Sequence, residues 1–574
     1  MKFIFSYLKP YKIRVTILMI IKALGTIADL VLPFLLAIMI DDLIPDATRE
    51  NYHSLIYLGL IMAAVALFGY LCNMRANRQA EYVAANAVRD IRNDLFYKVE
   101  ELSATQVDEI TTSSLVSRMT TDTYNLFSFF GMVQRLGIRA PLLLIGGIAM
   151  AFFLDPILAL LMIALLPFIV YITIRFTIKG QPLYHDIQLQ VDNLIRTVRE
   201  NITGVRVIRA LSMTDYEQQR FNHENNQTVK RELKATILMS KIRPLVDTIM
   251  NLGMVAVLIL GAFRIYNQHT SAAQIIALIT YFTLILNAMM SVTRIFIQTS
   301  RASASSARIK EVIDLQDNML SGDQPIVVDE NLPHISFEDV SFSYHNQEYH
   351  IENIAFDLYK GQTLGIIGTT GSGKTTLINL LLRFYDPQVG SIKVYGQNIK
   401  TIKTASLRSH MGLVLQNDLI FSDTIYENIQ FSRPNILKDD VEIAAEIAQA
   451  QFIHDIKEGY EHHLSQRGTN ISGGQKQRLL IARALAGRPD LLVLDDASSA
   501  LDYQTDMRLR QAINEQLKDT TKIIIAQRIS SIKDSDLILL IEDGKIIAQG
   551  THQELMQSSN TYKVLAHHQL GEVN

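Results

Sequence analysis

The sequence of 574 residues contains a single cysteine, Cys72, so no disulfide can form within one chain. Cys72 lies in an apolar stretch, and we interpret it as a packing residue. The chain also lacks a strong charge of either sign. Its net charge of −3 provides no global basic field, which argues against nucleic acid as a partner. The N-terminus is basic, but the apolar stretch after it is too long for the core of a cleavable signal peptide.

Hydrophobic residues make up 48% of a chain that is also 19% charged. That mixture indicates a membrane region joined to a soluble one. A helix needs about 20 residues to cross a hydrocarbon core of about 30 Å, and continuous apolar runs of that length favour helices over a barrel. Such runs precede residue 300 and predict six spans, at residues 15–40, 55–74, 136–154, 157–176, 245–265 and 273–296.

The connections between the spans predict their orientation. Lys and Arg are concentrated between spans two and three and between spans four and five, whereas the other connections hold only Arg49. Because basic connections stay in the cytoplasm, we expect a multi-pass protein of the cell membrane with both termini cytoplasmic. The two basic connections are long and have helical periodicity, so we expect the helices to continue beyond the bilayer.

The second half has a different pattern. A polar linker at residues 316–333 separates an expected membrane domain, residues 1–315, from residues 334–574. There, short apolar runs alternate with amphipathic helical segments, as in an α/β domain. The predicted fold is thus a polytopic α-helical membrane domain of six spans fused to an α/β P-loop nucleotide-binding domain.

The run "LGIIGTTGSGKTTLINLLLRF" carries the strongest local signal. An apolar strand leads into a glycine-rich loop, and an amphipathic helix follows. Backbone N–H groups of such a loop, together with the helix N-terminus, cradle phosphates. Lys374 would reach the outer phosphates of ATP, and the Thr375 hydroxyl would ligate Mg²⁺. The predicted nucleotide-binding residues here are Gly368, Thr369, Thr370, Gly371, Ser372, Gly373, Lys374, Thr375 and Thr376.

Two further segments bear on the same chemistry. Asp495 ends the apolar run "LLVLD" and is the expected partner of the magnesium ion. "NISGGQKQRLLIARAL" opens a helix at Ser472, Gly473, Gly474 and Gln475, whose first amides have no partner within the helix. A second phosphate-seeking helix end in one chain predicts a second nucleotide, shared with another subunit.

The ordered motifs resemble those of an ATP-binding-cassette exporter half-transporter across essentially the whole chain. "ISGGQ" is similar to the family's signature sequence, with Ile471 where leucine is usual. The resemblance implies that Gln416 contacts the nucleotide and its Mg²⁺, and that Tyr344 stacks on adenine. It makes the segment from Ser499 to Asp502 the D-loop, which crosses the dimer interface. It also implies that residues 113–123 and 204–221 are coupling segments that dock on nucleotide-binding domains.

Two residues depart from the family's pattern at its reaction centre. Asp496 stands where the family usually has the Glu that acts on the attacking water, and it is one methylene shorter. Gln527 stands where the switch histidine is usual, and it cannot become a cation. A third, quieter departure is Gln466, where related exporters often carry Glu. The resemblance therefore implies a degenerate ATP site in this chain. It also implies a non-identical partner that carries Glu and His, whose active site is completed by Ser472 and Gly474.

The sequence says less about the transported substrate than about the ATP site. Charges are costly within spans and usually face protein or water, and the spans hold Lys22, Asp29, Asp247 and Arg294. Asp247 and Arg294 lie at similar depth, so an ion pair between them is one hypothesis. The alternatives for these charged residues are a position near the inner interface or in a cytosolic helical extension, and direct contact with the substrate. Flexible methionines in spans five and six suit a cavity for varied apolar shapes, although lipid-facing packing explains them equally well: Met250, Met254, Met289 and Met290.

The resemblance favours small amphiphilic compounds, such as drugs or lipids, as substrate. A regulatory ATP-binding subunit that gates a pathway is an alternative, and so is a peptide exporter. The peptide exporter is weakened because the sequence has no added peptidase domain at its N-terminus.

Overall fold

The computed structural model describes residues 1–45, 52–316, 319, 321–344, 348–416 and 418–570, so Arg49 and part of the predicted linker (residues 317, 318 and 320) lie outside it. The chain divides into two compact units. The first unit consists of Met1–Val99 and Ser113–Leu315. The second consists of Glu100–Thr112 and Gln316–Asn574.

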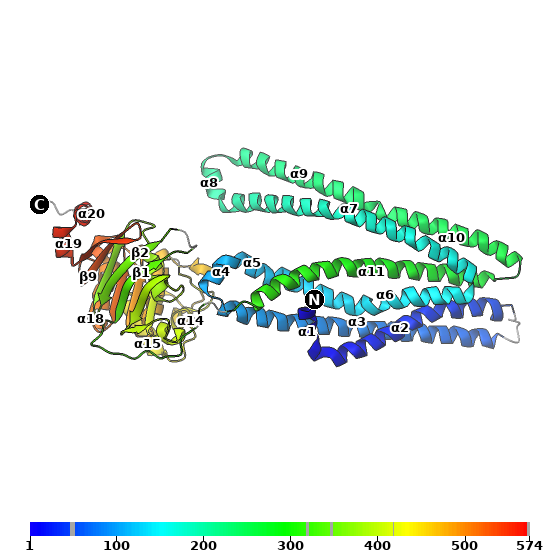
Figure 1. Ribbon diagram of the computed structural model, residues 1–574, viewed down its shortest axis with the longest axis horizontal. Helices are drawn as coiled ribbons and strands as arrows, with labels where there is room; N and C mark the ends of the chain where they lie inside the picture. The colour runs from blue at the N-terminus through cyan, green and yellow to red at the C-terminus, as the bar shows by residue number, and fades with distance from the viewer. Residues whose placement is uncertain (46–51, 317–318, 320, 345–347, 417, 571–574) are drawn as a thin grey trace. The chain divides into compact units, whose positions relative to one another are not determined.

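The first unit is built from long helices (Figure 1). Its elements are α1 (Lys2–Ser6), η1 (Lys9–Tyr11), α2 (Lys12–Ile38), η2 (Met39–Leu43), α3 (His53–Glu101), α5 (Thr112–Ser117), η3 (Arg118–Asp122), α6 (Thr123–Leu154), α7 (Pro156–Thr203), α8 (Val205–Ala210), α9 (Thr214–Ser240), α10 (Ile242–Tyr266) and α11 (Ala272–Ile313). Within this unit α6 packs against α2 and α11, whereas α9 and α10 return along α7.

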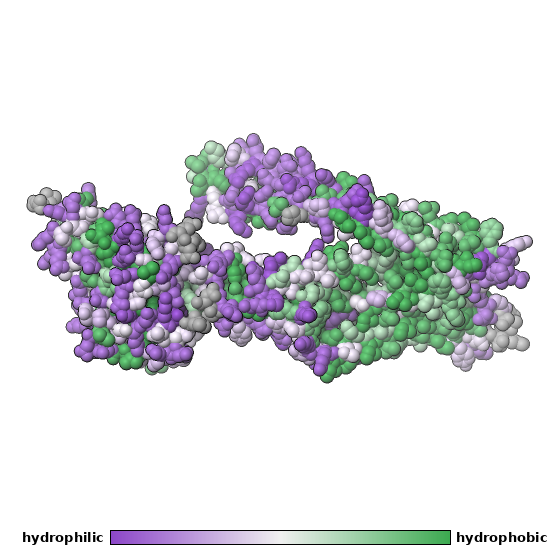
Figure 2. Space-filling model, in the orientation of Figure 1, coloured by the Kyte–Doolittle hydropathy of each residue, from purple (hydrophilic) through white to green (hydrophobic). Residues whose placement is uncertain are grey.

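Six helical segments of the described chain are long and apolar enough to cross a membrane, which confirms the six predicted spans. Several are far longer than a bilayer requires: α3 has 49 residues and α7 has 48, against the roughly 20 that suffice. Figure 2 shows hydrophobic side chains gathered over the span-bearing parts of these helices, while α9 is mainly hydrophilic. The continuation of the helices beyond the apolar band is therefore confirmed.

The turn between α6 and α7 is held by Asp155, which is 1% exposed. Pro156 follows at the first helical position, where its missing N–H costs nothing. The Asp155 carboxylate accepts hydrogen bonds from the N–H groups of Ile157 and Leu158, at 3.0 and 3.1 Å, and so caps α7. It also pairs with Arg264 of α10 at 2.6 Å, which ties the start of one span to the end of another.

The other charged residues of the spans are placed differently from the sequence hypothesis. Asp247 pairs with Arg243, one helical turn away on α10, at 3.9 Å. The proposed pair of Asp247 with Arg294 is absent among the described residues, because the i,i+4 neighbour on the same helix takes its place. Met289 is 8% exposed and packs in a buried cluster with Phe282 and Leu286.

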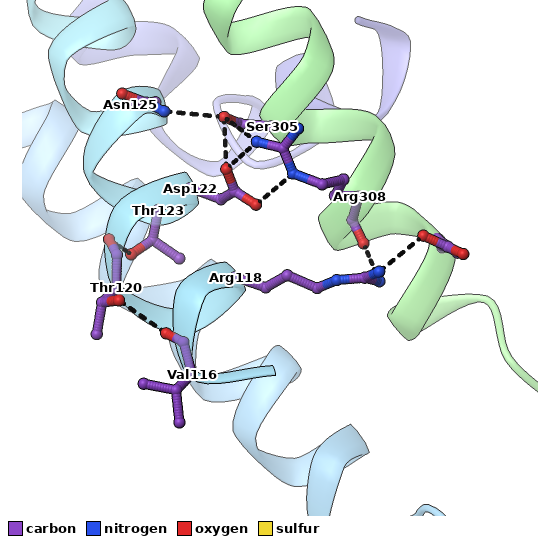
Figure 3. Close-up of polar contacts among 9 residues, drawn as sticks. Val116, Arg118, Thr120, Asp122, Thr123, Asn125, Ser305 and Arg308 are labelled. Atoms are coloured by element: carbon purple, nitrogen blue, oxygen red, sulfur yellow. Dashed lines mark hydrogen bonds and ion pairs between the residues drawn. The ribbon is translucent and has the colours of Figure 1, made fainter. Parts of the chain in front are cut away.

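A polar network joins the start of α6 to the distal part of α11 (Figure 3). The buried Asp122, at the end of the π-helical segment η3, accepts hydrogen bonds from Ser305 Oγ and Arg308 Nε, each at 2.8 Å. Arg118, also buried, donates from Nη1 to the Arg308 carbonyl at 2.8 Å. Its Nη2 pairs with Glu311 at 3.0 Å. Charged groups are rarely buried unless they are paired, and here each carries an opposite partner.

The second unit contains two sheets. The antiparallel four-stranded sheet has the order β2-β1-β4-β5, and the six-stranded sheet has the order β10-β9-β3-β8-β7-β6. In the latter, the neighbours from β9 to β6 run parallel, and β10 is an antiparallel edge strand. The strands are β1 (Ile335–Phe342), β2 (Ile351–Leu358), β3 (Thr363–Gly368), β4 (Val389–Val394), β5 (Gln397–Asn398), β6 (Met411–Val414), β7 (Leu491–Asp495), β8 (Thr521–Ile525), β9 (Leu537–Glu542) and β10 (Lys545–Gly550).

Helices complete the second unit, and the alternation of strands and helices confirms the α/β prediction. They are α4 (Ala104–Ile110), α12 (Lys374–Leu381), α13 (Thr404–Ser409), α14 (Ile425–Gln430), α15 (Lys438–Ile447), α16 (Phe452–Asp455), η4 (Gly459–Glu461), η5 (Gln466–Gly468), α17 (Gly473–Leu485), α18 (Tyr503–Gln516), η6 (Ile529–Ser531), α19 (His552–Ser558) and α20 (Asn560–Leu570).

Helix α4 reaches this unit from an earlier part of the sequence. Its Asp108 accepts a hydrogen bond from the Tyr385 hydroxyl at 2.6 Å, and Gln106 donates to the Gln316 carbonyl at 2.7 Å. Residues 113–123, the expected first coupling segment, belong to the first unit, whereas α4, which precedes them, packs within the second unit.

Candidate nucleotide site

The loop between β3 and α12 has the shape that phosphate binding needs. Strand β3 ends at Gly368 and helix α12 begins at Lys374, as the sequence predicts. Gly373 has φ of 95°, and a Cβ there would lie 2.6 Å from Ile351 Cγ2 and 2.8 Å from the His350 carbonyl. Only glycine fits this close approach, which turns the chain into the helix and leaves the first amides of α12 at the loop.

Lys374 lies over this loop. Its Nζ donates to the carbonyls of Gly368 at 3.0 Å and Thr369 at 2.7 Å, so the cation is held beside the loop that would cradle phosphates. Burial lowers the pKa of Lys374, and the nearby carboxylates of Asp495 and Asp496 oppose that shift.

Asp495 and Thr375 form the expected metal-binding pair. Asp495 ends β7, every residue of which is buried, and its Oδ2 accepts a hydrogen bond from Thr375 Oγ1 at 3.0 Å. Burial raises the pKa of Asp495, while the Thr375 hydrogen bond opposes the shift. A hydroxyl and a carboxylate oxygen at this separation fit Mg²⁺, which prefers hard oxygen ligands and a substrate phosphate.

These residues surround one cavity of about 270 Å³. Half of the predicted ATP- and metal-binding residues line it, together with Asp496, Gln527 and three residues that the motifs did not identify. The lining residues are His350, Thr370, Gly371, Gly373, Lys374, Thr375, Thr376, Gln416, Asp495, Asp496, Ile525, Ala526 and Gln527. The other loop residues adjoin it, since Lys374 bonds to Gly368 and Thr369 and lies 3.5 Å from Ser372 Oγ.

Asp496 and Gln527 contact each other in this cavity. The Gln527 amide donates from Nε2 to Asp496 Oδ2 at 3.3 Å. The Asp496 backbone has a positive φ of 51° and its N–H donates to the Ile525 carbonyl at 3.0 Å, which directs the residue away from the strand path. Burial raises the pKa of Asp496, and Arg528 and Lys374 oppose the shift. The two departures from the family pattern therefore meet at one place.

Tyr344 adjoins the cavity from the end of β1. Its hydroxyl contacts Thr376 Oγ1 at 3.3 Å and accepts a hydrogen bond from Asn379 at 3.2 Å. The exposed ring of His350 lies edge-on to it, with centroids 5.0 Å apart. His350 had no motif to identify it, because its place at the cavity comes from the packing of β2 against the loop.

The signature helix lies apart from this cavity. Ser472 is the N-cap of α17: its Oγ accepts a hydrogen bond from the Gln475 N–H at 3.2 Å, and Gln475 Oε1 accepts one from the Ser472 N–H at 2.9 Å. The D-loop is adjacent, since a Cβ on Gly474 would lie 3.3 Å from the Ala500 carbonyl. None of Ser472, Gly473, Gly474 and Gln475 is among the residues that line the cavity in the described chain.

Comparisons with known proteins agree with this arrangement. Residues 15–289 match the family described as ABC transporter transmembrane region, and residues 351–499 match the family described as ABC transporter. YfiB of Bacillus subtilis (strain 168), an uncharacterized ABC transporter ATP-binding protein, is 32% identical over 99% of this chain and 98% of its own length. The "Putative multidrug export ATP-binding/permease protein YgaD" of the same organism is 30% identical, with 98% of each chain covered.

A solved structure shares the fold. It is a bacterial Atm1-family ABC exporter with ATP bound, and it superposes with a TM-score of 0.83 over 98% of this chain and 99% of its own, at 23% identity.

Proposed function

The chain belongs to the ABC transporter family, and from this premise we propose that it is one subunit of a heterodimeric exporter of amphiphilic compounds. Its ATPase domain and membrane region make it an ATP-hydrolysing transporter of half-transporter size. The printed name of the YgaD relative assigns that protein to multidrug export, which supports drugs or lipids as cargo. The basic connections between the spans support a place in the cytoplasmic membrane with both termini in the cytoplasm.

The contact between Gln527 and Asp496 carries the heterodimer proposal. The carboxylate that would act on the attacking water is short, and a neutral amide at 3.3 Å occupies the neighbouring position. A displacement of about 1 Å costs roughly a hundredfold in rate when a base must meet a water in line with a phosphate. Two such changes at one centre leave a site that binds ATP and hydrolyses it slowly.

The signature segment at the start of α17, in contrast, keeps the residues that phosphate binding needs. Ser472 and Gly474 open a capped helix of 13 residues, and the unpaired amides at its start can bind a nucleotide phosphate. Because this helix does not line the chain's own cavity, it would serve the nucleotide held by a partner. That partner supplies the Glu and His that this chain lacks. Two copies of this chain would form two impaired sites.

Helix α8 supports a docking role for the second coupling segment. It has no buried residue, and it and the turn after it expose apolar side chains: Val205, Val207, Leu211 and Met213. Exposed apolar groups gathered at a helical turn mark an interaction surface. We assign this surface to a nucleotide-binding domain of the assembled transporter.

ATP hydrolysis by the purified chain tests the proposal. The chain is prepared alone in nanodiscs and also with a co-expressed half-transporter that carries Glu and His. We expect magnesium-dependent phosphate release at least about a hundredfold faster from the complex than from the chain alone. Binding of a fluorescent ATP analogue to the chain alone is the control, since a slow but folded site still binds nucleotide. Equal turnover by the chain alone and by the complex would refute the heterodimer.

A further inference from the structure

A charged cluster lies between α2, α3 and α6 in the part of the first unit that carries the spans. Arg139 of α6 pairs with Asp29 of α2 at 3.2 Å, and Arg135 of α6 pairs with Glu81 of α3. Lys22 of α2 is 2% exposed and donates to the neutral Asn77 of α3 at 2.9 Å. No ion pair to Lys22 occurs among the described residues. Three cations and two carboxylates therefore give the cluster a net charge of +1.

The cluster lies at a definite depth. Arg139 is fifteen residues before the end of α6 at Leu154, which is about 22 Å along the helix axis. Asp29 is about 20 Å from the end of η2 at Leu43, so the two partners lie at matching levels. With both termini cytoplasmic, these helix ends are the outer ones. Across a hydrocarbon core of about 30 Å, the Arg139 pair then lies in the inner half of the bilayer. By the same rise, Arg135 and Lys22 lie about 28 and about 31 Å from those ends, so the cluster extends to the inner boundary of the core.

Arg135 and Arg139 direct guanidinium N–H groups toward the exposed side of α6. Arg135 and Arg139 are four residues apart on α6, so they share one helix face. Their side chains remain 37% and 38% exposed in the single chain. A guanidinium has five N–H donors, and each of these pairs uses one terminal nitrogen. The buried Nε of Arg139 has no hydrogen-bond partner in the described part of the chain.

A charged face at this depth does not face lipid. Intramembrane charges are expensive, and they face protein or a water-filled pathway. Paired groups alone would satisfy a purely structural role, but the cluster keeps a surplus cation, and each arginine uses only one terminal nitrogen in its pair on a side chain that is more than a third exposed. Guanidinium groups recognise carboxylate and phosphate oxygens.

We propose that this face of α2, α3 and α6 binds the anionic headgroup of a single-chain amphiphile, a carboxylate or a phosphate, on its way through the transporter. The proposal rests on the export function above and specifies its cargo. The headgroup bonds to Arg135 and Arg139, and Lys22 supplies the positive potential behind them. The inner-half depth suits a molecule that enters from the inner leaflet with its tail toward the bilayer centre.

Binding of a headgroup series tests this. The complex is placed in phosphatidylcholine nanodiscs without nucleotide, and radiolabelled dodecyl phosphate is bound at equilibrium. Unlabelled dodecyl phosphate, dodecyl maltoside and dodecyltrimethylammonium, which share one tail, then compete with it. We expect the neutral and cationic heads to compete at least about tenfold more weakly, because they form no charge-assisted bond to the arginines. Equal competition by the cationic head would overturn the proposal. Equal competition by inorganic phosphate would show a free-anion site and would also overturn it.

Variants locate the site. The double change Asp29→Asn with Arg139→Gln removes one pair at constant net charge, and Lys22→Gln removes the surplus cation. Each variant should bind dodecyl phosphate with an affinity at least about tenfold lower than that of the wild type. Arg243→Gln is the matched control, because its side chain is 88% exposed on α10, outside the cluster. Unchanged affinity in both test variants would refute the assignment. ATP turnover of the complex is read separately, so failure of export and failure of headgroup binding are distinguishable.

Discussion

Asp496 and Gln527 contact each other at 3.3 Å, so their effects on hydrolysis should be coupled. Asp496→Glu restores the reach of the carboxylate, but Gln527 still offers it an amide and no cation. Gln527→His offers the cation to a carboxylate that is too short. We expect each single change to raise ATP turnover of the isolated chain less than about threefold and the double change to raise it about a hundredfold, well above the product of the two single effects. Phosphate release in nanodiscs measures this.

The control for this pair is Gln466→Glu, which reverts the third departure outside the cavity and should leave turnover of the isolated chain unchanged. Additive effects of the two single changes would contradict the coupling and would assign each residue an independent role.

His334 predicts a pH dependence of stability. Its ring is buried, stacks on Tyr395 with centroids 4.4 Å apart, and contacts Thr521 Oγ1 through Nδ1 at 2.7 Å. Burial lowers the pKa of His334 to about 4. Between pH 6.5 and 4 the unfolded chain binds a proton that the folded chain rejects. Stability should therefore fall as the pH falls through this range, by at most about 3 kcal/mol.

The midpoint of thermal unfolding of the second unit, followed from pH 7 to pH 4.5 in the intact chain, measures this effect. His334→Asn keeps a polar group beside Thr521 without a titratable ring, and its unfolding midpoint should drop less as the pH is lowered. The exposed His223→Asn is the matched control and should retain the full drop. Parallel curves for the wild type and His334→Asn would rule His334 out as the source.

At the scale of elements, the sequence identified those whose signal is local. Gly368 and Asp495 each end an apolar run, and Ser472 precedes two glycines; in the structure a strand ends at each of the first two, and a helix begins directly after Ser472. Contacts between segments that are far apart in the sequence leave no such local pattern, so the sequence alone did not predict them. The hydrogen bond of Asp108 to Tyr385 and the place of His350 beside the phosphate loop depend on how remote elements pack. Asp247 shows the same limit, because similar depth on two helices predicts a pair with Arg294, whereas Asp247 pairs with Arg243 on its own helix.

The link between α6 and α11 gives an element-scale prediction. Asp122 is 1% exposed and accepts from Ser305 and Arg308, whereas Glu311 of the same network is 60% exposed. Asp122→Asn should destabilise the first unit by about 2 kcal/mol, because it removes the buried carboxylate charge that pairs with Arg308; the Arg308 side chain is 49% exposed, which keeps the loss below that of a fully buried pair. Glu311→Gln should cost less than about 1 kcal/mol, because Glu311 is exposed and the glutamine oxygen can still accept a hydrogen bond from the buried Arg118. Unfolding midpoints in detergent compare the two, and a larger loss for Glu311→Gln would contradict the ranking.

At the scale of the whole transporter, the proposed heterodimer has two nucleotide sites of unequal activity, and this chain would contribute to both. Lys374 serves the site built on this chain, whereas Ser472 would serve the active site of the partner. In the complex, Lys374→Met should therefore lower ATP turnover less than tenfold. Ser472→Ala should lower it by about a hundredfold or more, as expected when a donor to a transferring phosphoryl group is lost.

Ser472 also caps α17, and losing a cap costs about 1 kcal/mol. Ser472→Asn separates the two roles, because asparagine caps a helix as well as serine does but has no hydroxyl to offer the phosphate. Its unfolding midpoint should match the wild type while its turnover falls as far as that of Ser472→Ala. If Lys374→Met instead abolished turnover while Ser472→Ala spared it, the active site would be the one built on this chain. The pairing of a short carboxylate with an amide would then have no catalytic consequence.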